Sequence, residues 1–146
     1  MEIIKMSQNF LDHIKSLLPY AEVHLIYKNK AYAKVPKEYW IDSAKKLKSA
    51  GFTLLSFVSG IDRLNSIEVI YACRKPEGNG LVIVGTIIDR NNPRIPSLIT
   101  VWEGALWHER ETFDLLGIYF EGNPDMRRIL LPDEWVGHPL RKDYKW

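Results

Sequence analysis

The chain has little of what disulfide-rich, zinc-binding and membrane-embedded proteins require. Its 146 residues include one cysteine, Cys73, which excludes an intrachain disulfide and a zinc site built on several thiolates. The net charge is only +2, so no strong basic field predicts a nucleic acid or an anionic membrane as partner. The longest apolar run, residues 81–88, is far shorter than the ~20 residues of a membrane-spanning helix. We therefore expect no transmembrane segment, and the first eight residues lack the apolar core of a signal peptide.

Motifs of the common enzyme classes are also missing. His108-Glu109-Arg110-Glu111-Thr112 begins like a zinc-protease helix, but Thr112 stands where the second histidine ligand is needed. His13, His24 and His138 belong to separate elements, without the spacing of metal ligands. The sequence has no nucleophile elbow, phosphate-binding loop or dinucleotide fingerprint. We expect no metal, no cofactor and no catalytic residue in this chain.

What is present is the composition of an ordinary globular domain, with 46% hydrophobic and 26% charged residues. Helical spacing of apolar residues predicts helices over 7–18, 36–50 and 97–116, with Trp40, Ala44 and Leu47 as the inner stripe of the second. Extended patterns predict strands over 22–27, 31–35, 53–59, 66–74 and 81–89. The order α-β-β-α-β-β-β-α predicts an α+β fold of two layers. Its helices would pack on one mixed, largely antiparallel five-stranded sheet.

Two local patterns refine this prediction. Pro76-Glu77-Gly78-Asn79-Gly80 predicts a hairpin, because Asn-Gly adopts positive φ at low cost. Residues 81–88 are continuously apolar, which predicts a strand covered on both faces. After Gly117 the periodic pattern ends, and prolines and charges dominate. We therefore predict an α+β domain over residues 1–117 and an extended segment over residues 118–146, called the strap below, that docks on a partner subunit.

The third predicted helix places unusual side chains on opposite faces. At 100° per residue, Glu109 lies on the apolar stripe that faces the core, where a carboxylate needs hydrogen-bond donors or a cation. Trp107 and Glu111 lie on the opposite side, and Arg110 and Asp114 share one flank. An exposed indole between charged residues is typical of an interface anchor.

Three strings near the C-terminus carry a family resemblance. They are WHERETFDLLGIYF (residues 107–120), GNPDMRRILLP (122–132) and HPLRKDY (138–144). In this order they resemble the 30 kDa subunit of respiratory complex I, also called the C-type subunit of NADH:quinone oxidoreductase, and the related small subunits of membrane-bound nickel–iron hydrogenases. One departure is Asn123, which stands where the family pattern usually has a histidine and so lacks a titratable ring.

The resemblance implies a non-catalytic structural subunit of the hydrophilic arm of a membrane-associated redox complex. Such a subunit docks on the large nickel–iron-hydrogenase-like (49 kDa-type) subunit and the neighbouring iron–sulfur small subunit. It lies peripherally on the cytoplasmic side, while iron–sulfur clusters and nickel–iron or quinone sites belong to the partners of this electron-transport, ion-translocating machine. We expect the residues that bind these partners to be Trp107, Glu111, Arg127, Arg128, His138, Pro139, Leu140, Arg141, Lys142, Asp143 and Tyr144.

Two alternatives stay open. Within the resemblance, the complex is either an NADH:quinone oxidoreductase or a membrane-bound hydrogenase, because the electron donor and acceptor belong to other chains. Outside it, the chain is a free-standing enzyme acting on small anions. That enzyme would use Glu109 or Glu111 as general base and the C-terminal arginines as a clamp. RNA binding is a weaker rival, since no aromatic-rich sheet motif accompanies the basic residues.

Overall fold

The computed structural model describes residues 2–146, and of Ile3 the backbone alone. Its elements follow the predicted order with three short additions. They are α1 (Glu2–Leu17), β1 (Glu22–Tyr27), β2 (Lys30–Lys34), the 3-10 turn η1 (Lys37–Tyr39), α2 (Trp40–Ser49), β3 (Leu54–Asp62), β4 (Ile67–Arg74), β5 (Leu81–Ile88), β6 (Arg94–Pro96), α3 (Ala105–Leu116) and β7 (Tyr119–Glu121).

One mixed sheet of five strands organises the molecule, in the order β1-β2-β5-β4-β3. β2 and β5 are parallel, and the other neighbours are antiparallel. The predicted α+β fold is confirmed, as is the β4–β5 hairpin. Its positive φ of +81° lies at Gly78 and not at the expected Asn79-Gly80 pair, because the N–H of Gly78 closes the turn on the carbonyl of Lys75.

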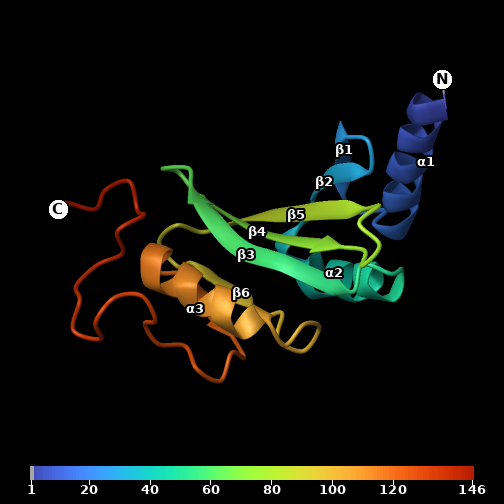
Figure 1. Cartoon of the computed structure of the whole chain (residues 1–146). Helices are drawn as coiled ribbons and strands as arrows, with labels where there is room; N and C mark the ends of the chain where they lie inside the picture. Colours follow the sequence, from blue (N-terminus) through green and yellow to red (C-terminus); the bar gives the residue numbers. More distant parts are fainter. Residues whose placement is uncertain (1) are drawn as a thin grey trace.

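The helices lie on one side of this sheet (Figure 1). The core between the layers includes Ile14 of α1, Trp40 and Leu47 of α2, and Tyr71 of β4, all at 0% exposure. The Tyr71 hydroxyl lies 2.6 Å from the Ser43 hydroxyl of α2. The predicted inner stripe of the second helix is therefore confirmed.

The opposite face of the sheet is left uncovered by the described residues. The prediction that β5 is covered on both faces is wrong for this side, because Ile87 is 40% exposed and Leu81 and Ile83 are only half-buried. A two-layer fold covers one face of a central strand, and an apolar run alone does not show whether a third layer is present.

The third helix begins later than predicted, at Ala105 instead of near Ser97. Residues 97–104 form bends and turns without a helix, and the Ser97 hydroxyl and the N–H of Leu98 donate to the Glu109 carboxylate instead of to helix carbonyls. No sequence pattern indicated β6 and β7, which form a small parallel pair. Through β7 the first residues of the strap enter the core, where Ile118 and Phe120 are fully buried.

The rest of the strap has no helix or strand. It wraps around α3 (orange), as the red end of the chain shows in Figure 1. Helix α3 ends at Gly117, whose φ of +76° is left-handed and whose N–H donates to the carbonyl of Phe113. The chain therefore reverses here, so that the strap can return along the helix that precedes it.

Candidate partner interface

The inward carboxylate of α3 joins three parts of the chain. Glu109 is fully buried and accepts hydrogen bonds from the Ser97 hydroxyl, the Leu98 N–H at 2.7 Å and the Asn123 amide at 3.0 Å. Burial raises the pKa of Glu109 above its ordinary value, and the three donors oppose this shift. The predicted satisfied core carboxylate is confirmed. Asn123 acts in this site as a neutral donor, a role that needs no titratable ring.

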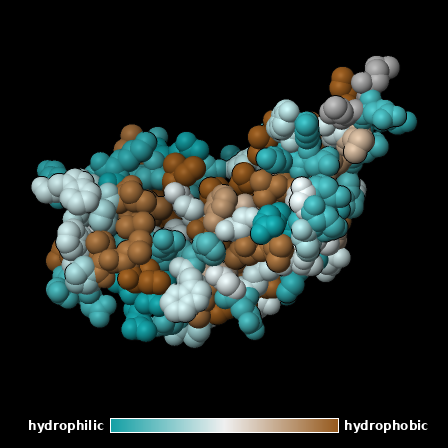
Figure 2. Space-filling view, viewed as in Figure 1, coloured by the Kyte–Doolittle hydropathy of each residue, from teal (hydrophilic) through white to brown (hydrophobic). Residues whose placement is uncertain are grey.

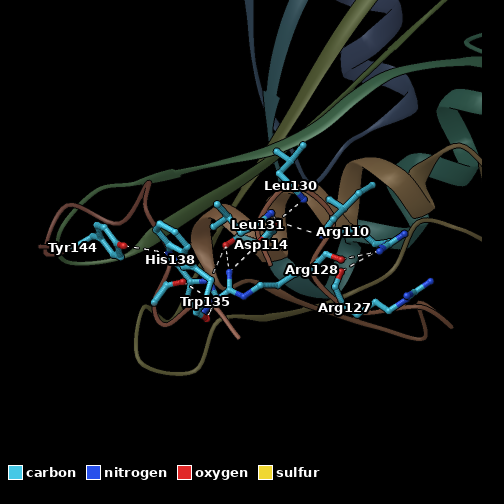
Figure 3. Close-up of polar contacts among 11 residues, drawn as sticks. Arg110, Asp114, Arg127, Arg128, Leu130, Leu131, Trp135, His138 and Tyr144 are labelled. Carbon is cyan, nitrogen blue, oxygen red and sulfur yellow. Dashed lines mark hydrogen bonds and ion pairs between the residues drawn. The ribbon is translucent and has the colours of Figure 1, made fainter. Parts of the chain in front are cut away.

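A second carboxylate on α3 gathers the strap. Asp114 is fully buried, and the Arg128 guanidinium donates to its Oδ1 at 2.6 Å. Its Oδ2 accepts three backbone N–H groups, at 3.2, 2.7 and 2.9 Å, from Ile129, Leu130 and Leu131. Figure 3 shows this carboxylate at the centre of the contacts. Burial opposes ionisation of Asp114, but these donors outweigh it, so its pKa lies below the ordinary value.

Arg110 holds the strap one helical turn earlier. Its guanidinium donates to the carbonyl oxygens of Arg127 and Arg128, at 3.2 and 2.8 Å, and lies 3.4 Å from the Asp125 carboxylate. It also lies over the Trp107 ring, 5.3 Å from the centroid. The prediction that Arg110 and Asp114 share one flank of this helix is therefore confirmed, and both side chains bind the strap.

The end of α3 holds the next part of the strap. The His138 ring packs against Phe113, with centroids 5.9 Å apart, and its Nδ1 lies 3.0 Å from the carbonyl oxygen of Asp114. The guanidinium of Arg141 donates to the carbonyl of Leu116. These side chains satisfy carbonyls that have no partner within the helix.

The last anchor lies at the end of β3. Arg90 binds the buried Asp62 carboxylate with two hydrogen bonds of 2.9 Å, and the N–H of Lys142 donates to the same carboxylate at 2.9 Å. The Arg90 hydrogen bond lowers the pKa of Asp62 far below its ordinary value, although burial opposes this. Asp143 lies 3.3 Å from Arg90 but is 69% exposed, so it adds little.

The predicted partner-binding residues therefore separate into two sets. Arg128, His138 and Arg141 turn inward, where they bind α3. Trp107, 58% exposed, and Leu140, 57% exposed, turn outward, with the exposed side chains of Glu111, Arg127 and Lys142. Pro139 and Tyr144 are half-buried, and Tyr144 accepts a hydrogen bond from the Trp135 indole at 3.1 Å.

Other outward residues of the strap escaped sequence reasoning. They are Leu130, Trp135, Val136 and Trp146, exposed to 56%, 36%, 87% and 91%. No periodicity marks them, so their only sequence signal is that they are large and apolar in a segment rich in charge. Figure 2 shows hydrophobic patches on the end of the molecule that carries the strap, interrupted by hydrophilic residues.

Neither a metal-binding cluster nor a membrane-spanning helix is found among the residues that the structure describes. Within residues 2–146 no three His, Cys, Asp or Glu side chains gather where they could hold a metal ion. Cys73 is buried, and burial raises the pKa of its thiol, which disfavours the reactive thiolate. No helix in this range is long and apolar enough to cross a bilayer.

Comparison with known families supports the resemblance seen in the sequence. The model of the family described as respiratory-chain NADH dehydrogenase, 30 Kd subunit, matches residues 33–146. The C-type subunit of the NADH-quinone oxidoreductase of Moorella thermoacetica is 37% identical over 140 residues, which are 94% of each chain. The J-type subunit of the chloroplastic NAD(P)H-quinone oxidoreductase of Anthoceros angustus is 36% identical over 137 residues, 90% of this chain and 81% of that one.

Two solved structures share the fold. A chain of the membrane-bound sulfane sulfur reductase, an archaeal respiratory membrane complex, superposes with a TM-score of 0.83 at 26% identity, covering 94% of this chain and 85% of that chain. A trypsin-resistant fragment of Nqo5 superposes with a TM-score of 0.68 at 24% identity, covering 81% of this chain and 97% of the fragment. The α+β fold is thus found in other solved proteins.

Proposed function

The chain belongs to the family of 30 kDa subunits of respiratory-chain NADH dehydrogenases, and from this premise we propose that it is a structural subunit that docks through α3 and the strap. It is a 30 kDa-type component of a multisubunit respiratory complex. The partner that we propose is the large nickel–iron-hydrogenase-like (49 kDa-type) subunit, with the iron–sulfur small subunit beside it. In this arrangement the chain lies peripherally on the cytoplasmic side of the membrane.

The observation that carries this proposal is that the strap exposes large apolar side chains beyond Arg128, although its first residues, Ile118 and Phe120, are buried. Its cationic side chains Arg128 and Arg141 turn inward to α3, while Leu130 and Val136 turn outward at 56% and 87% exposure. A segment that served only to cover its own domain would bury its apolar side chains. Exposed apolar patches among polar residues, as at this end of the molecule (Figure 2), are typical of a protein–protein interface.

The geometry also explains how the strap can bind at low entropic cost. Asp114, Arg110 and Asp62 hold it by hydrogen bonds to its backbone, so it is ordered before a partner arrives. A preorganised segment loses less conformational freedom on binding. Each large apolar side chain that it buries then contributes about 1.5–3 kcal/mol.

We further propose that the redox cofactors of the complex lie in its other subunits. The buried Cys73 and the separation of the histidines on different elements support this assignment. The metal content of the purified complex identifies its type. Nickel in the large subunit indicates a hydrogenase-like complex, and flavin with NADH oxidation indicates a dehydrogenase.

The rival hypothesis of a small-anion enzyme is less well supported. Glu109 is fully buried and bound by three donors, whereas Glu111 is exposed on another face of α3. Arg128 and Arg141 are occupied by Asp114 and a helix carbonyl. The proposed general bases and the arginine clamp therefore do not converge on one site.

Co-purification tests the docking proposal. The double variant Leu130→Asp/Val136→Asp should reduce recovery of the chain with the large subunit at least tenfold, because each carboxylate must lose its hydration in an apolar interface. Both side chains are exposed, so the melting temperature of the free chain should not change.

The matched control is Ile4→Asp/Met6→Asp, which changes two exposed residues of α1 at the opposite end of the molecule (Figure 1). This control should assemble like the unmodified chain. Equal recovery of the strap variant and the control would refute docking through the strap.

A further inference from the structure

The open face of the sheet is a second surface, separate from α3 and the strap. The strand register shows which residues lie on this face, because the side chains of paired residues point to the same side of the sheet. Leu81 of β5 pairs with Lys30 of β2 and with Arg74 of β4. Two residues further along, Ile83 pairs with Tyr32 and Ala72. The buried Val82 and Val84 alternate with these residues and face the helices.

Apolar side chains form the floor of this face. Leu81, Ile83, Ile70 and Phe57 are half-buried by their neighbours on the sheet. Leu54, Ile61 and Ile87 extend the floor at 37%, 36% and 40% exposure. No element of the described chain covers them, and both α3 and the strap lie on the other side of the sheet (Figure 1). Glu68, bound by Tyr32 and Arg63, lies between Ile87 and Ile61. The continuous part of the floor is therefore formed by Leu81, Ile83, Ile70 and Phe57, and an exposed apolar patch of this kind is typical of a binding surface.

Cations border the floor. Lys30 and Arg74 flank Leu81, and a groove of about 470 Å³ at this end is lined by these residues together with Lys28 and Phe57. Lys34 lies two residues beyond Tyr32 on the same face. Lys34 lies opposite Glu22 of β1, and Glu68 is bound by Arg63 at 2.7 Å and by the Tyr32 hydroxyl. At the other end, Lys28, Lys30 and Arg74 take part in none of the ion pairs found among the described residues.

From this chemistry we infer that the open face binds an amphipathic helix of another subunit, with an apolar stripe bordered by carboxylates. This inference rests on the proposed function, since it takes the helix from the same complex. A helix is the ordinary third layer on a sheet, and its carboxylates would meet Lys30, Arg74 and Lys28.

The size of the face supports this occupant. Five strands about 4.8 Å apart and about seven residues long, at ~3.3 Å per residue, give a face of roughly 550 Å² in projection. A stable interface buries about 800 Å² on each partner. A helix is about 10 Å wide, so one helix along the strands covers about half of this face and supplies part of the contact with its subunit.

Charge argues against a second copy of this chain as the occupant, and side-chain burial argues against a lipid bilayer. A second copy of this chain would bring its own Lys30 and Arg74 against the same cations, and like charges at an interface are unfavourable. A bilayer would suit protruding apolar side chains, whereas Leu81, Ile83 and Ile70 form a half-buried floor.

Photo-crosslinking in the assembled complex tests the inference. We would place p-benzoyl-phenylalanine at Ile83 and map the crosslinked peptide by mass spectrometry. The expected product is a peptide of another subunit, net negative, with apolar residues at helical spacing. The same probe at Lys45, exposed on α2 and thus on the helix side of the sheet, should not capture this peptide.

Charge reversal is the second arm of the test. Lys30→Glu/Arg74→Glu should lower the crosslink yield per chain at least tenfold, whereas the control Lys5→Glu/Lys15→Glu on α1 should leave it unchanged. A crosslink to a second copy, to lipid, to a peptide without carboxylates or to nothing would overturn the inference, as would an unchanged yield in the charge-reversed variant.

The two proposals fail separately. Co-purification tests docking through the strap, and the identity of the crosslinked peptide tests helix binding to the open face. A complex that assembles through the strap but yields no helix at Ile83 would overturn this inference alone.

Discussion

Replacement of Asp114 by asparagine tests whether one buried carboxylate holds the strap on α3. Its Oδ1 accepts from Arg128, and its Oδ2 accepts three backbone N–H groups from residues 129–131. Asparagine has nearly the same shape but presents one NH2 group. In either orientation of the amide, a donor then faces Arg128 or faces the three N–H groups.

The magnitude follows from the number of donors that lose their acceptor. A hydrogen bond to a charged group contributes about 1.5–3 kcal/mol, and breaking a buried ion pair from one side costs about 3–5 kcal/mol. Asp114 and Arg128 have side chains 0% and 11% exposed, so solvent screening is weak. We expect the free energy of strap opening to fall by about 3–5 kcal/mol, which multiplies the open population by roughly a hundred to a few thousand.

Amide hydrogen exchange measures this population directly. The N–H groups of residues 129–131 should lose protection by that factor in Asp114→Asn, while the amides of β4 and β5 should keep theirs. The matched control is Asp143→Asn, because Asp143 is 69% exposed in its ion pair with Arg90 and should contribute less than about 1 kcal/mol. Unchanged protection of residues 129–131, or an equal loss in β4 and β5, would refute the role assigned to Asp114.

Two further predictions concern the fold around α3. Gly117→Ala should lower the free energy of unfolding by about 2–3 kcal/mol, since φ is +76° and the new Cβ would lie 2.7 Å from the His138 ring. Gly78→Ala has similar backbone strain with no atom within 4 Å and should cost only about 1 kcal/mol; equal losses in thermal denaturation would contradict the clash. Asn123→Asp should place a carboxylate beside Glu109 and raise the pKa values of both groups. A raised folded-state pKa means that stability is kept at low pH and lost as pH rises, so the variant should match the unmodified chain near pH 4 and lose about 2–3 kcal/mol by pH 7. A deficit of the same size at both pH values would show that the two carboxylates do not interact.

Helices and strands could be predicted because the spacing of their apolar residues reflects burial against the adjacent layer. The stripe of Trp40, Ala44 and Leu47 is buried, and a hairpin joins β4 and β5 as expected. The projection of α3 also placed Glu109 in the core and Trp107 outside. The hairpin was expected from Asn79-Gly80, but its positive φ lies at Gly78. In the helices the decisive interactions lie within the element or directly beneath it, where spacing along the chain determines direction.

The strings of the strap identified the family, because residue identity in a fixed order suffices for that. They did not show which way each side chain turns. Arg128 and Arg127 are adjacent, yet Arg128 binds Asp114 and Arg127 is exposed. An aperiodic segment has no repeat that separates an inner from an outer face. The direction of each side chain is therefore determined by the contacts that it makes in the folded protein.

Local pattern by itself thus determined the α+β class and the order of the main elements, and the three strings near the C-terminus identified the respiratory subunit family. Only the tertiary structure decided that the strap presents Leu130 and Val136 outward, that Lys142 reaches Asp62 from 80 residues away, and that β5 has one open face. These features depend on pairs of groups far apart in the chain, and the free energy that selects them exists only once those groups meet.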